Sequence, residues 1–336
     1  MGSGNWSVGT YTTRATTKAA VGKSTFDYND LVRSGRAKAV NVLLDPKMTA
    51  GPTSPFAGKV MREVVISDEH PNPTAIAIVL DVTGSNIDAA RVVHSKLPQL
   101  HALLQRKGYA EDPQINVCAV GDANSDRFPL QVGQFESDNR IDEQLEAMIL
   151  EGNGGGQTHE TYELGAYFLS RHTHVEPFEK QGRKGYAFFI GDEMPYDVVK
   201  KQQVANLIGD SLESDIPTKA IFDELQQRYE VFFLFQQQGS YRAEDILPPW
   251  RKLLGERALV LEDPAAVCEF IAGTLGMLEA GYDHDEIMDD LVAIGASASA
   301  TKAAGKALAK VGGGRGPVVK AIGSLPDLGS SRATRL

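Results

Sequence analysis

One apolar run constrains the fold of this chain more than any other feature. Residues 74–80 read TAIAIVL, and the run ends abruptly at Asp81 in the string DVTGSN. A run that is apolar at nearly every position, without alternation, is typical of a parallel strand covered on both faces. We therefore predict a central strand here, with the carboxylate of Asp81 at its carboxyl end.

Further strands of this kind recur along the chain, separated by helical patterns. A shorter, alternating run at residues 128–135 is typical of an edge strand. Strands that alternate with helices predict a doubly wound, mostly parallel sheet with helices on both faces and one short antiparallel edge strand. The other apolar runs lie at 114–122, 185–193, 230–237 and 257–263, and the helical patterns at 86–108, 139–150, 158–173, 195–209, 217–229 and 264–280.

Composition divides the 336 residues into three parts. Residues 1–72, which begin with a stretch rich in Ser, Thr, Gly, Ala and basic residues, predict an extended N-terminal arm and linker. Residues 73–282 carry the regular pattern and predict the sheet domain. Residues 283–336 predict a C-terminal helical segment and a basic tail, and their Ala-rich stretch has helix propensity but little apolar surface to bury.

Charge is distributed unevenly along the chain. The net charge is −10, yet residues 1–44 hold six Lys or Arg against two acids, and residues 291–336 hold seven against one. The two ends thus contribute +4 and +6, which leaves −20 on residues 45–290. An acidic body argues against nucleic-acid binding through that body. We expect the basic ends to be solvated arms or partner-docking segments.

The sequence also bears on the cellular compartment. No apolar run reaches the roughly 20 residues of a membrane helix, and residues 1–20 contain no segment of signal-peptide type. Cys118 and Cys268 stand inside apolar runs, which is typical of buried thiols in a reducing compartment. We expect a cytoplasmic protein, or one that forms part of a virion or another assembly.

Three separated loops place oxygen-bearing side chains after strands of the predicted sheet. Ligands of open parallel sheets bind beyond the carboxyl ends of the strands, so these side chains are expected to converge. Carboxylates and hydroxyls are hard ligands that suit Mg²⁺, with Mn²⁺ or Ca²⁺ as alternatives. So few charges would neutralise the ion incompletely and leave it able to bind a carboxylate from outside. The side chains are Asp81, Thr83 and Ser85 in the first loop, Thr158 after the glycines at 154–156 in the second, and Asp192 in the string GDE of the third.

These motifs, in this order, resemble the metal-ion-dependent adhesion site of the von Willebrand factor A (vWA) family. The family pattern is usually written Asp-x-Ser-x-Ser, and here Thr83 replaces the first serine, while Asn86 stands where a methionine often follows. The resemblance covers about 73–282 and implies a vWA/Rossmann-like fold. It also implies that Ser85, Thr83 and Thr158 contact the metal directly or through water. By the same resemblance, Asp81 and Asp192 mostly hold coordinating waters.

The strings VTGSN, GDANSD and EGNGGGQ are similar to an intracellular, bacterial or phage-type branch of the same family. Intracellular members of the family often work beside AAA+ ATPases of the MoxR type or as parts of larger assemblies. The resemblance therefore implies a protein partner that offers a carboxylate. We expect no membrane partner, because no apolar run reaches the length of a membrane helix.

Other polar motifs have simpler interpretations. DVTGS alone could equally be a helix-capping turn, and the two further loops in order favour metal binding. Asp122 and Asp126 could form a rim, a second cation site or a solvated acidic loop, of which we favour the loop.

The histidines are not expected to bind a metal. His172 and His174 cannot share one helix face, so we expect no zinc site, and His159 is expected to begin a helix. AAVGKST lacks the first glycine of a phosphate-binding loop.

The sequence is compatible with three functions from different classes. The favoured one is a metal-dependent protein-binding module, which is not an enzyme. The second is a structural subunit of a phage-type or other large assembly, with terminal segments that order on assembly. The third is a Mg²⁺-dependent phosphohydrolase. It is disfavoured because a second aspartate, expected two positions after the first as acid or base, is replaced by Thr83.

Overall fold

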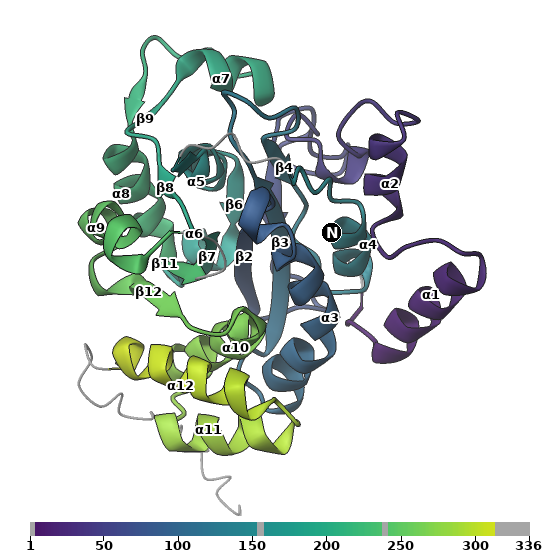
Figure 1. The fold of residues 1–336 in the computed structure, drawn as a ribbon, viewed down its shortest axis with the longest axis vertical. Coiled ribbons are helices and arrows are strands. Elements are labelled where there is room, and N and C mark those ends of the chain that lie inside the picture. The colour runs from purple at the N-terminus through teal and green to yellow at the C-terminus, as the bar shows by residue number, and fades with distance from the viewer. Residues whose placement is uncertain (1–3, 153–157, 237–240, 313–336) are drawn as a thin grey trace, which may run out of the picture.

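The computed structural model describes residues 4–152, 158–236 and 241–312. Its centre is a six-stranded sheet in the order β12-β11-β7-β2-β3-β4, in which all neighbours are parallel except β3 and β4 (Figure 1). This confirms the predicted doubly wound, vWA/Rossmann-like fold with one short antiparallel edge strand. The strands are β2 (Pro73–Asp81), β3 (Asp112–Val120), β4 (Leu130–Val132), β7 (Gly185–Gly191), β11 (Tyr229–Gln236) and β12 (Ala258–Leu261).

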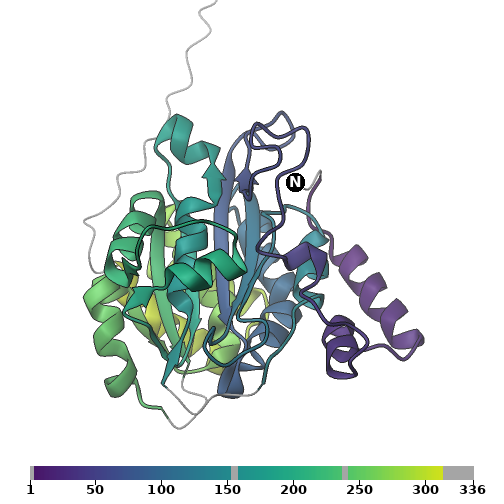
Figure 2. The same ribbon diagram turned by 90° about the horizontal axis from the view of Figure 1, so that it is seen from above.

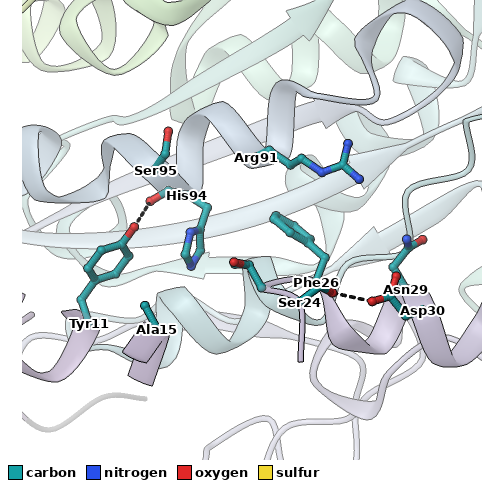
Figure 3. A pocket seen from close by; sticks show the side chains of 10 residues that line it. Tyr11, Ala15, Ser24, Phe26, Asn29, Asp30, Arg91, His94 and Ser95 are labelled. Carbon is teal, nitrogen blue, oxygen red and sulfur yellow. Dashed lines mark hydrogen bonds between the residues drawn. The ribbon is translucent and has the colours of Figure 1, made fainter. Parts of the chain in front are cut away.

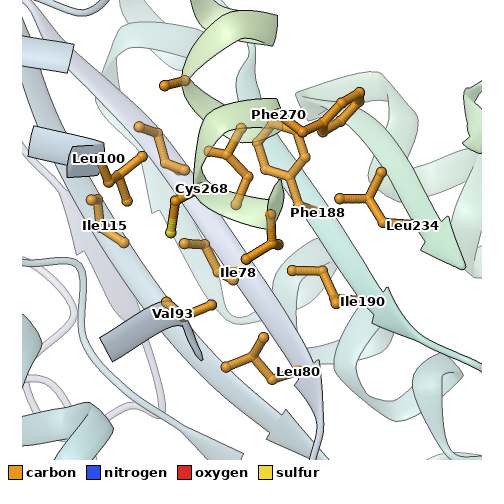
Figure 4. Close-up of a cluster of buried hydrophobic side chains, with 14 of the residues drawn as sticks. Ile78, Leu80, Val93, Leu100, Ile115, Phe188, Ile190, Leu234, Cys268 and Phe270 are labelled. Carbon is orange, nitrogen blue, oxygen red and sulfur yellow. The ribbon is translucent and has the colours of Figure 1, made fainter. Parts of the chain in front are cut away.

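The apolar run at 74–80 forms the central strand because it must be buried on both faces. All nine residues of β2 are buried. Ile76, Ile78 and Leu80 point into one apolar cluster, which Figure 4 shows with the side chains of α3 and α10. Ala75 and Val79, on the alternate positions, join the other cluster. A strand that feeds two cores cannot alternate between apolar and polar residues, which explains the continuous run.

Helices cover both faces of the sheet, as Figures 1 and 2 show. One layer contains α3 (Ala89–His101), α4 (Arg140–Glu146), α10 (Val267–Leu278), α11 (His284–Ala293) and α12 (Ala298–Gly312). The other contains α5 (Tyr162–Arg171), α7 (Lys201–Leu207), α8 (Thr218–Arg228) and α9 (Ala243–Leu254). No helix in the described ranges has the length and apolar character needed to cross a bilayer.

Several helices begin or end elsewhere than the pattern predicts. The helical pattern of 86–108 is divided between α3, which continues through Pro98, and a π-helical turn at Ala102–Arg106. The pattern of 158–173 becomes helical only at Tyr162, because β5 (His159–Glu160) pairs in parallel with β8 (Met194–Pro195). This second difference places the side chain of residue 160 in the candidate site.

Both segments outside 73–282 contact the sheet domain. In the N-terminal segment, α1 (Val8–Ala20), α2 (Asp27–Arg33) and β1 (Arg62–Val64) are formed, and β1 pairs in parallel with β6 (Thr173–Val175) beside α6 (Glu176–Gln181). Trp6 is buried, stacks on His101 with ring centroids 4.5 Å apart, and donates its indole N–H to Asp142. Helix α1 itself buries no residue. The predicted boundaries of the three parts stay predictions.

A pocket of about 420 Å³ lies between the N-terminal segment and α3 (Figure 3). Tyr11 and Phe26 line it from the N-terminal side, and Arg91 and His94 from α3. The Tyr11 hydroxyl donates to the carbonyl oxygen of His94 across one side of the pocket. None of the residues that line it belongs to the predicted metal site.

The Ala-rich stretch buries more apolar surface than its composition indicates. Ala300, Ala304 and Leu308 of α12 are fully buried in the same cluster as α10. Small residues allow the two helices to approach closely, since a Cβ placed on Gly273 of α10 would lie 2.6 Å from Leu308 Cδ1. The expectation that this stretch has little to bury is therefore wrong.

One buried arginine joins the N-terminal segment to the edge of the sheet. Arg62 has no exposed surface, and its guanidinium donates to carbonyl oxygens of both segments. The acceptors are Met48 at 2.7 Å, Asp45 at 2.8 Å, Gly133 at 2.9 Å, Val132 at 3.2 Å and Met61 at 3.3 Å. Among the described residues the arginine forms no salt bridge to a carboxylate, and it instead satisfies a set of buried backbone acceptors.

We predict that Arg62→Met lowers the free energy of unfolding by about 3 kcal/mol or more, because buried carbonyls lose a charged donor. Urea unfolding followed by tryptophan fluorescence measures the change. Arg171→Met is the control, since Arg171 makes a half-exposed pair with Glu224 and should cost less than about 1 kcal/mol. Equal effects of the two substitutions would refute this role of Arg62.

Candidate metal centre

Two aspartates meet where neighbouring strands end. Asp81 is the last residue of β2, and Asp192 directly follows β7. Because β2 and β7 are parallel neighbours, both carboxylates lie at the same edge. The order of strands reverses at this point of the sheet, where open α/β sheets bind ligands. Both aspartates are buried, at 0% and 1% exposure.

Asn86 connects the two aspartates. Its side-chain amide nitrogen lies 3.3 Å from Asp81 Oδ2 and also donates to Asp192 Oδ1. Asn86 is fully buried at the end of the turn Gly84–Asn86, which starts at a glycine with φ of +34°. In the sequence Asn86 stands out only as a departure from the family pattern. The structure shows that it orients both carboxylates.

Thr83 places a hydroxyl between two acids. Asp81 Oδ1 accepts the backbone N–H of Thr83 at 2.9 Å and lies 2.7 Å from its hydroxyl. The same hydroxyl lies 2.9 Å from Glu160 Oε1. A hydroxyl has one proton, so it can donate to only one of these carboxyl groups. The other contact requires either a proton on the acid or a cation at the hydroxyl oxygen.

The second loop reaches this edge through its backbone. The carbonyl oxygen of Thr158 accepts the N–H of Met194 at 3.0 Å, which holds the loop beside the residues that follow β7. The Thr158 hydroxyl lies 3.1 Å from His159 Nδ1. The side chain of Ser85 and the glycines at 154–156 lie outside the described part of the chain. Of the predicted ligands, the structure thus brings together the side chains of Asp81, Thr83 and Asp192.

Two glutamates that were not predicted as ligands belong to the same cluster. Glu160 and Glu193 are 3% and 8% exposed, and within the described residues neither forms a salt bridge to a basic side chain. Glu193 is visible in the sequence directly after Asp192. Nothing in the sequence marks Glu160, because the helical pattern of 158–173 hides the two-residue strand that carries it.

Burial and mutual repulsion raise the pKa values of these acids. Burial, with the charge of Asp192 nearby, raises the pKa of Asp81 to about 7. Burial and the charge of Asp81 raise the pKa of Glu193 to about 8. Burial, followed by the charges of Asp81 and Glu193, raises the pKa of Glu160 well above its usual range. The cluster therefore holds either protons or a cation at neutral pH.

Several oxygens of the cluster lack hydrogen-bond partners. Asn86 Oδ1, Glu160 Oε2 and Glu193 Oε2 are buried and accept no hydrogen bond from the described residues. The carboxyl groups of Glu160 and Glu193 interact, and they can hydrogen-bond to each other only if one is protonated. Buried oxygens without donors are costly, and a bound cation would satisfy them. The donors present are all oxygens and fit a hard divalent ion.

The carboxylates alone do not complete such a site. Within the described ranges, no group of three or more His, Cys, Asp or Glu side chains could by itself hold a metal ion. An ion here would need hydroxyl groups and waters among its ligands. Mg²⁺ commonly keeps several waters and is held by one or two carboxylates.

The other polar residues considered as ligands form hydrogen bonds outside the proposed metal site. Asp122 is 1% exposed and accepts hydrogen bonds from Ser125 and Tyr196, so the expectation of a solvated loop is wrong for this residue. Asp126 Oδ2 accepts the backbone N–H of Asp122. His172 lies 2.7 Å from Asp210 Oδ2 through its Nε2.

The two remaining histidines pack against aromatic rings. His174 packs against Phe56 with ring centroids 4.8 Å apart. His159 belongs to β5, so it does not begin a helix as expected, and its ring stacks on Tyr196.

Comparison with known proteins yields structural similarity only. No family model matches the chain, and no curated protein matches it. The pilus adhesin SpaC of Lactobacillus rhamnosus GG superposes with a TM-score of 0.44 and 12% identity, over 69% of this chain and 31% of SpaC. The vWF domain of the type V pili tip protein Mfa5 of Porphyromonas gingivalis gives 0.40 and 11%, over 63% and 97%. Proximal thread matrix protein 1 of the mussel byssus gives 0.39 and 10%, over 62% and 47%.

All three TM-scores are below 0.5, so these similarities carry no conclusion about function. The chain spans about a third of the length of SpaC and about half of the byssus protein.

We predict that the metal-free protein loses stability as the pH rises from about 4 to about 8. The folded-state pKa values of Asp81 and Glu193 lie above the usual carboxyl values, so their protonated forms stabilise the fold at low pH. This contribution is lost as the pH passes about 7 to 8. Urea unfolding in chelator at each pH measures it, and Asp81→Asn should flatten the decline. Identical pH profiles for the two proteins would contradict the prediction.

Proposed function

We propose that this chain is a protein-binding module that uses a divalent cation. Mg²⁺, or Mn²⁺ or Ca²⁺ in its place, binds at the sheet edge and accepts an acidic residue of a partner protein as a ligand. The residues that hold the ion are Asp81, Thr83, Ser85, Thr158 and Asp192. When bound, the ion supplies a positive charge with a coordination position open to a carboxylate.

One observation carries the proposal. Asp81 is fully buried at the switch point of the sheet, contacts the Thr83 hydroxyl, and makes no salt bridge to a basic side chain of the described residues. A buried carboxylate without a positive partner is costly, and such groups are candidates for functional sites. A divalent cation is the simplest partner that this arrangement of oxygens fits.

Each residue has a defined task in this proposal. The hydroxyl groups of Thr83, Ser85 and Thr158 contact the ion directly or through water. Asp81 and Asp192 mostly hold the ion's waters. Asn86 fixes the direction of both carboxylates through one amide group. Second-layer contacts of this kind orient ligands and tune metal affinity. Binding rather than catalysis is proposed, because Thr83 occupies the position where an acid or base would be needed.

The partner is proposed to be a protein with an exposed Asp or Glu. An AAA+ ATPase of the MoxR type and the subunits of a larger assembly are the two classes that the family resemblance implies. With these partners the chain would be cytoplasmic or would form part of a virion or another assembly. The −20 charge of residues 45–290 disfavours nucleic acid as the partner of the body.

We predict that calorimetry detects one Mg²⁺ site in the full chain, and that Asp81→Asn weakens Mg²⁺ binding about tenfold or more. An immobilised peptide with a single Asp should bind the wild-type protein in Mg²⁺ and not in chelator. Glu143→Gln is the control, because Glu143 pairs with Arg14 on the surface, and its Mg²⁺ affinity should equal that of the wild type. Absence of Mg²⁺ binding, or peptide binding that chelator does not change, would refute the proposal.

A specific observation favours a second candidate, a structural subunit of a phage-type or other large assembly. The N-terminal segment exposes large apolar side chains, which are Val8, Val21, Val42 and Leu43. Val42 and Leu43 are adjacent in the sequence, and we propose that they form part of an interaction surface. Such a surface would be buried between subunits.

Light scattering at increasing concentration tests this second candidate. We predict self-association that weakens in Val42→Ser, because Val42 is the most exposed of these side chains at 74%. Val292→Ser, on α11, is a matched control at 66% exposure. A strict monomer at the highest concentration would count against an assembly subunit.

A further inference from the structure

We propose that Glu160 is an internal ligand of the same cation and occupies the coordination position that a partner's acid would take. The inference rests on the proposed function and deepens it. The chain then caps its own metal site, and a partner binds by displacing Glu160. Neither the sequence motifs nor the family resemblance assigns Glu160 to the site.

The contact with Thr83 is the first support. Glu160 Oε1 lies 2.9 Å from the Thr83 hydroxyl oxygen, and that oxygen lies 2.7 Å from Asp81 Oδ1. Any ion that coordinates the Thr83 oxygen is therefore adjacent to the Glu160 carboxylate. Glu160 Oε2 is buried and has no hydrogen-bond partner among the described residues, so it has an unused acceptor in this cluster.

The backbone on both sides of Glu160 is held in place. Strand β5 pairs with β8, in which Glu160 lies opposite Pro195, and this ties the residue to the loop after β7. On the other side, the N–H and hydroxyl of Thr161 both donate to the carbonyl oxygen of Gly121 at the end of β3. Glu160 is thus fixed between the ends of two strands. An acid that is positioned in this way is organised before the ion arrives.

The negative charge of Glu160 affects how strongly the ion can bind a partner's carboxylate. Because Asp81 and Asp192 are proposed to hold the ion through waters, they neutralise it incompletely, and ionised Glu160 and Glu193 would add two further negative charges. An ion that already binds Glu160 gains little from another acid, so a partner's carboxylate must exchange with Glu160. Only molecules in which Glu160 is displaced can bind the partner. The apparent affinity for the partner is therefore the intrinsic affinity multiplied by the fraction of such molecules.

The low solvent exposure of the site residues is consistent with a metal site that Glu160 covers. Asp81, Thr83 and Glu160 are exposed by 0%, 4% and 3%. In this proposal, a partner's carboxylate becomes a ligand of the ion only after the Glu160 side chain has left its coordination position. The capping contact therefore acts as a restraint on partner binding, built from the short pairing of β5 and β8.

The substitution Glu160→Gln tests the proposal in the full-length chain. It keeps the size and hydrogen-bonding shape of the side chain but removes its negative charge. We expect Mg²⁺ affinity, measured by calorimetry, to fall about tenfold or more. At saturating Mg²⁺, affinity for the immobilised Asp peptide should rise severalfold, because the internal competitor is weakened.

Glu163→Gln is the matched control. Glu163 is a second fully buried glutamate in the same segment, and it accepts the backbone N–H of Tyr196 at 3.2 Å. Both affinities of this variant should equal those of the wild type. Circular dichroism checks folding, and if Glu160→Gln does not fold, Glu160→Asp replaces it. The shorter side chain retracts the carboxylate from Thr83, and both affinities should change in the same directions.

The outcomes separate this inference from the function on which it rests. Weaker Mg²⁺ binding together with tighter peptide binding in Glu160→Gln supports capping by Glu160. An unchanged Mg²⁺ affinity, or a peptide affinity that does not rise, overturns it while wild-type Mg²⁺ binding still supports the proposed function. If the wild-type protein binds no Mg²⁺, the proposed function and the inference both fail.

Discussion

Four carboxyl groups crowd the edge of the sheet where β2 and β7 end, and burial removes the water that would screen them. Asp81, Glu160, Asp192 and Glu193 are each less than a tenth exposed. Like charges in a low-dielectric environment repel strongly, so the group can exist only with protons or with a cation. The proposed binding activity depends on this constraint, since the same repulsion that disfavours the empty, ionised cluster favours a divalent ion.

The fold creates the crowding as a consequence of its topology. Parallel strands bring their carboxyl ends to one edge, and the reversal of strand order places β2 beside both β3 and β7. The interior of the sheet resists rearrangement, because Ile78 and Val79 of β2 are fully buried in opposite cores. The acids at the strand ends are thus held on a rigid base. The short β5–β8 pairing adds Glu160 from a loop.

The sequence predicts those parts of the molecule that have a period or a motif. The doubly wound sheet follows from continuous apolar runs, and Asp81, Thr83 and Asp192 follow from motifs at strand ends. Glu160 could not be predicted, because a two-residue strand has no period and its segment has a helical pattern. In the sequence, Asn86 only departs from a family pattern that often has methionine at this position. In the structure, its side-chain amide contacts both Asp81 and Asp192. The contacts of Trp6 and Arg62 depend on single residues far apart in sequence, which no local pattern reveals.

The most direct measurement of the central claim is anomalous diffraction from crystals of the full chain soaked in MnCl₂. Mn²⁺ has the same preference for oxygen ligands as Mg²⁺ and can be located by its anomalous signal. We predict one peak within coordination distance of the Thr83 hydroxyl, with Asp81 and Asp192 around it and Glu160 as a ligand. Well-ordered crystals without a peak at this edge, or with Mn²⁺ bound only elsewhere, would contradict the account.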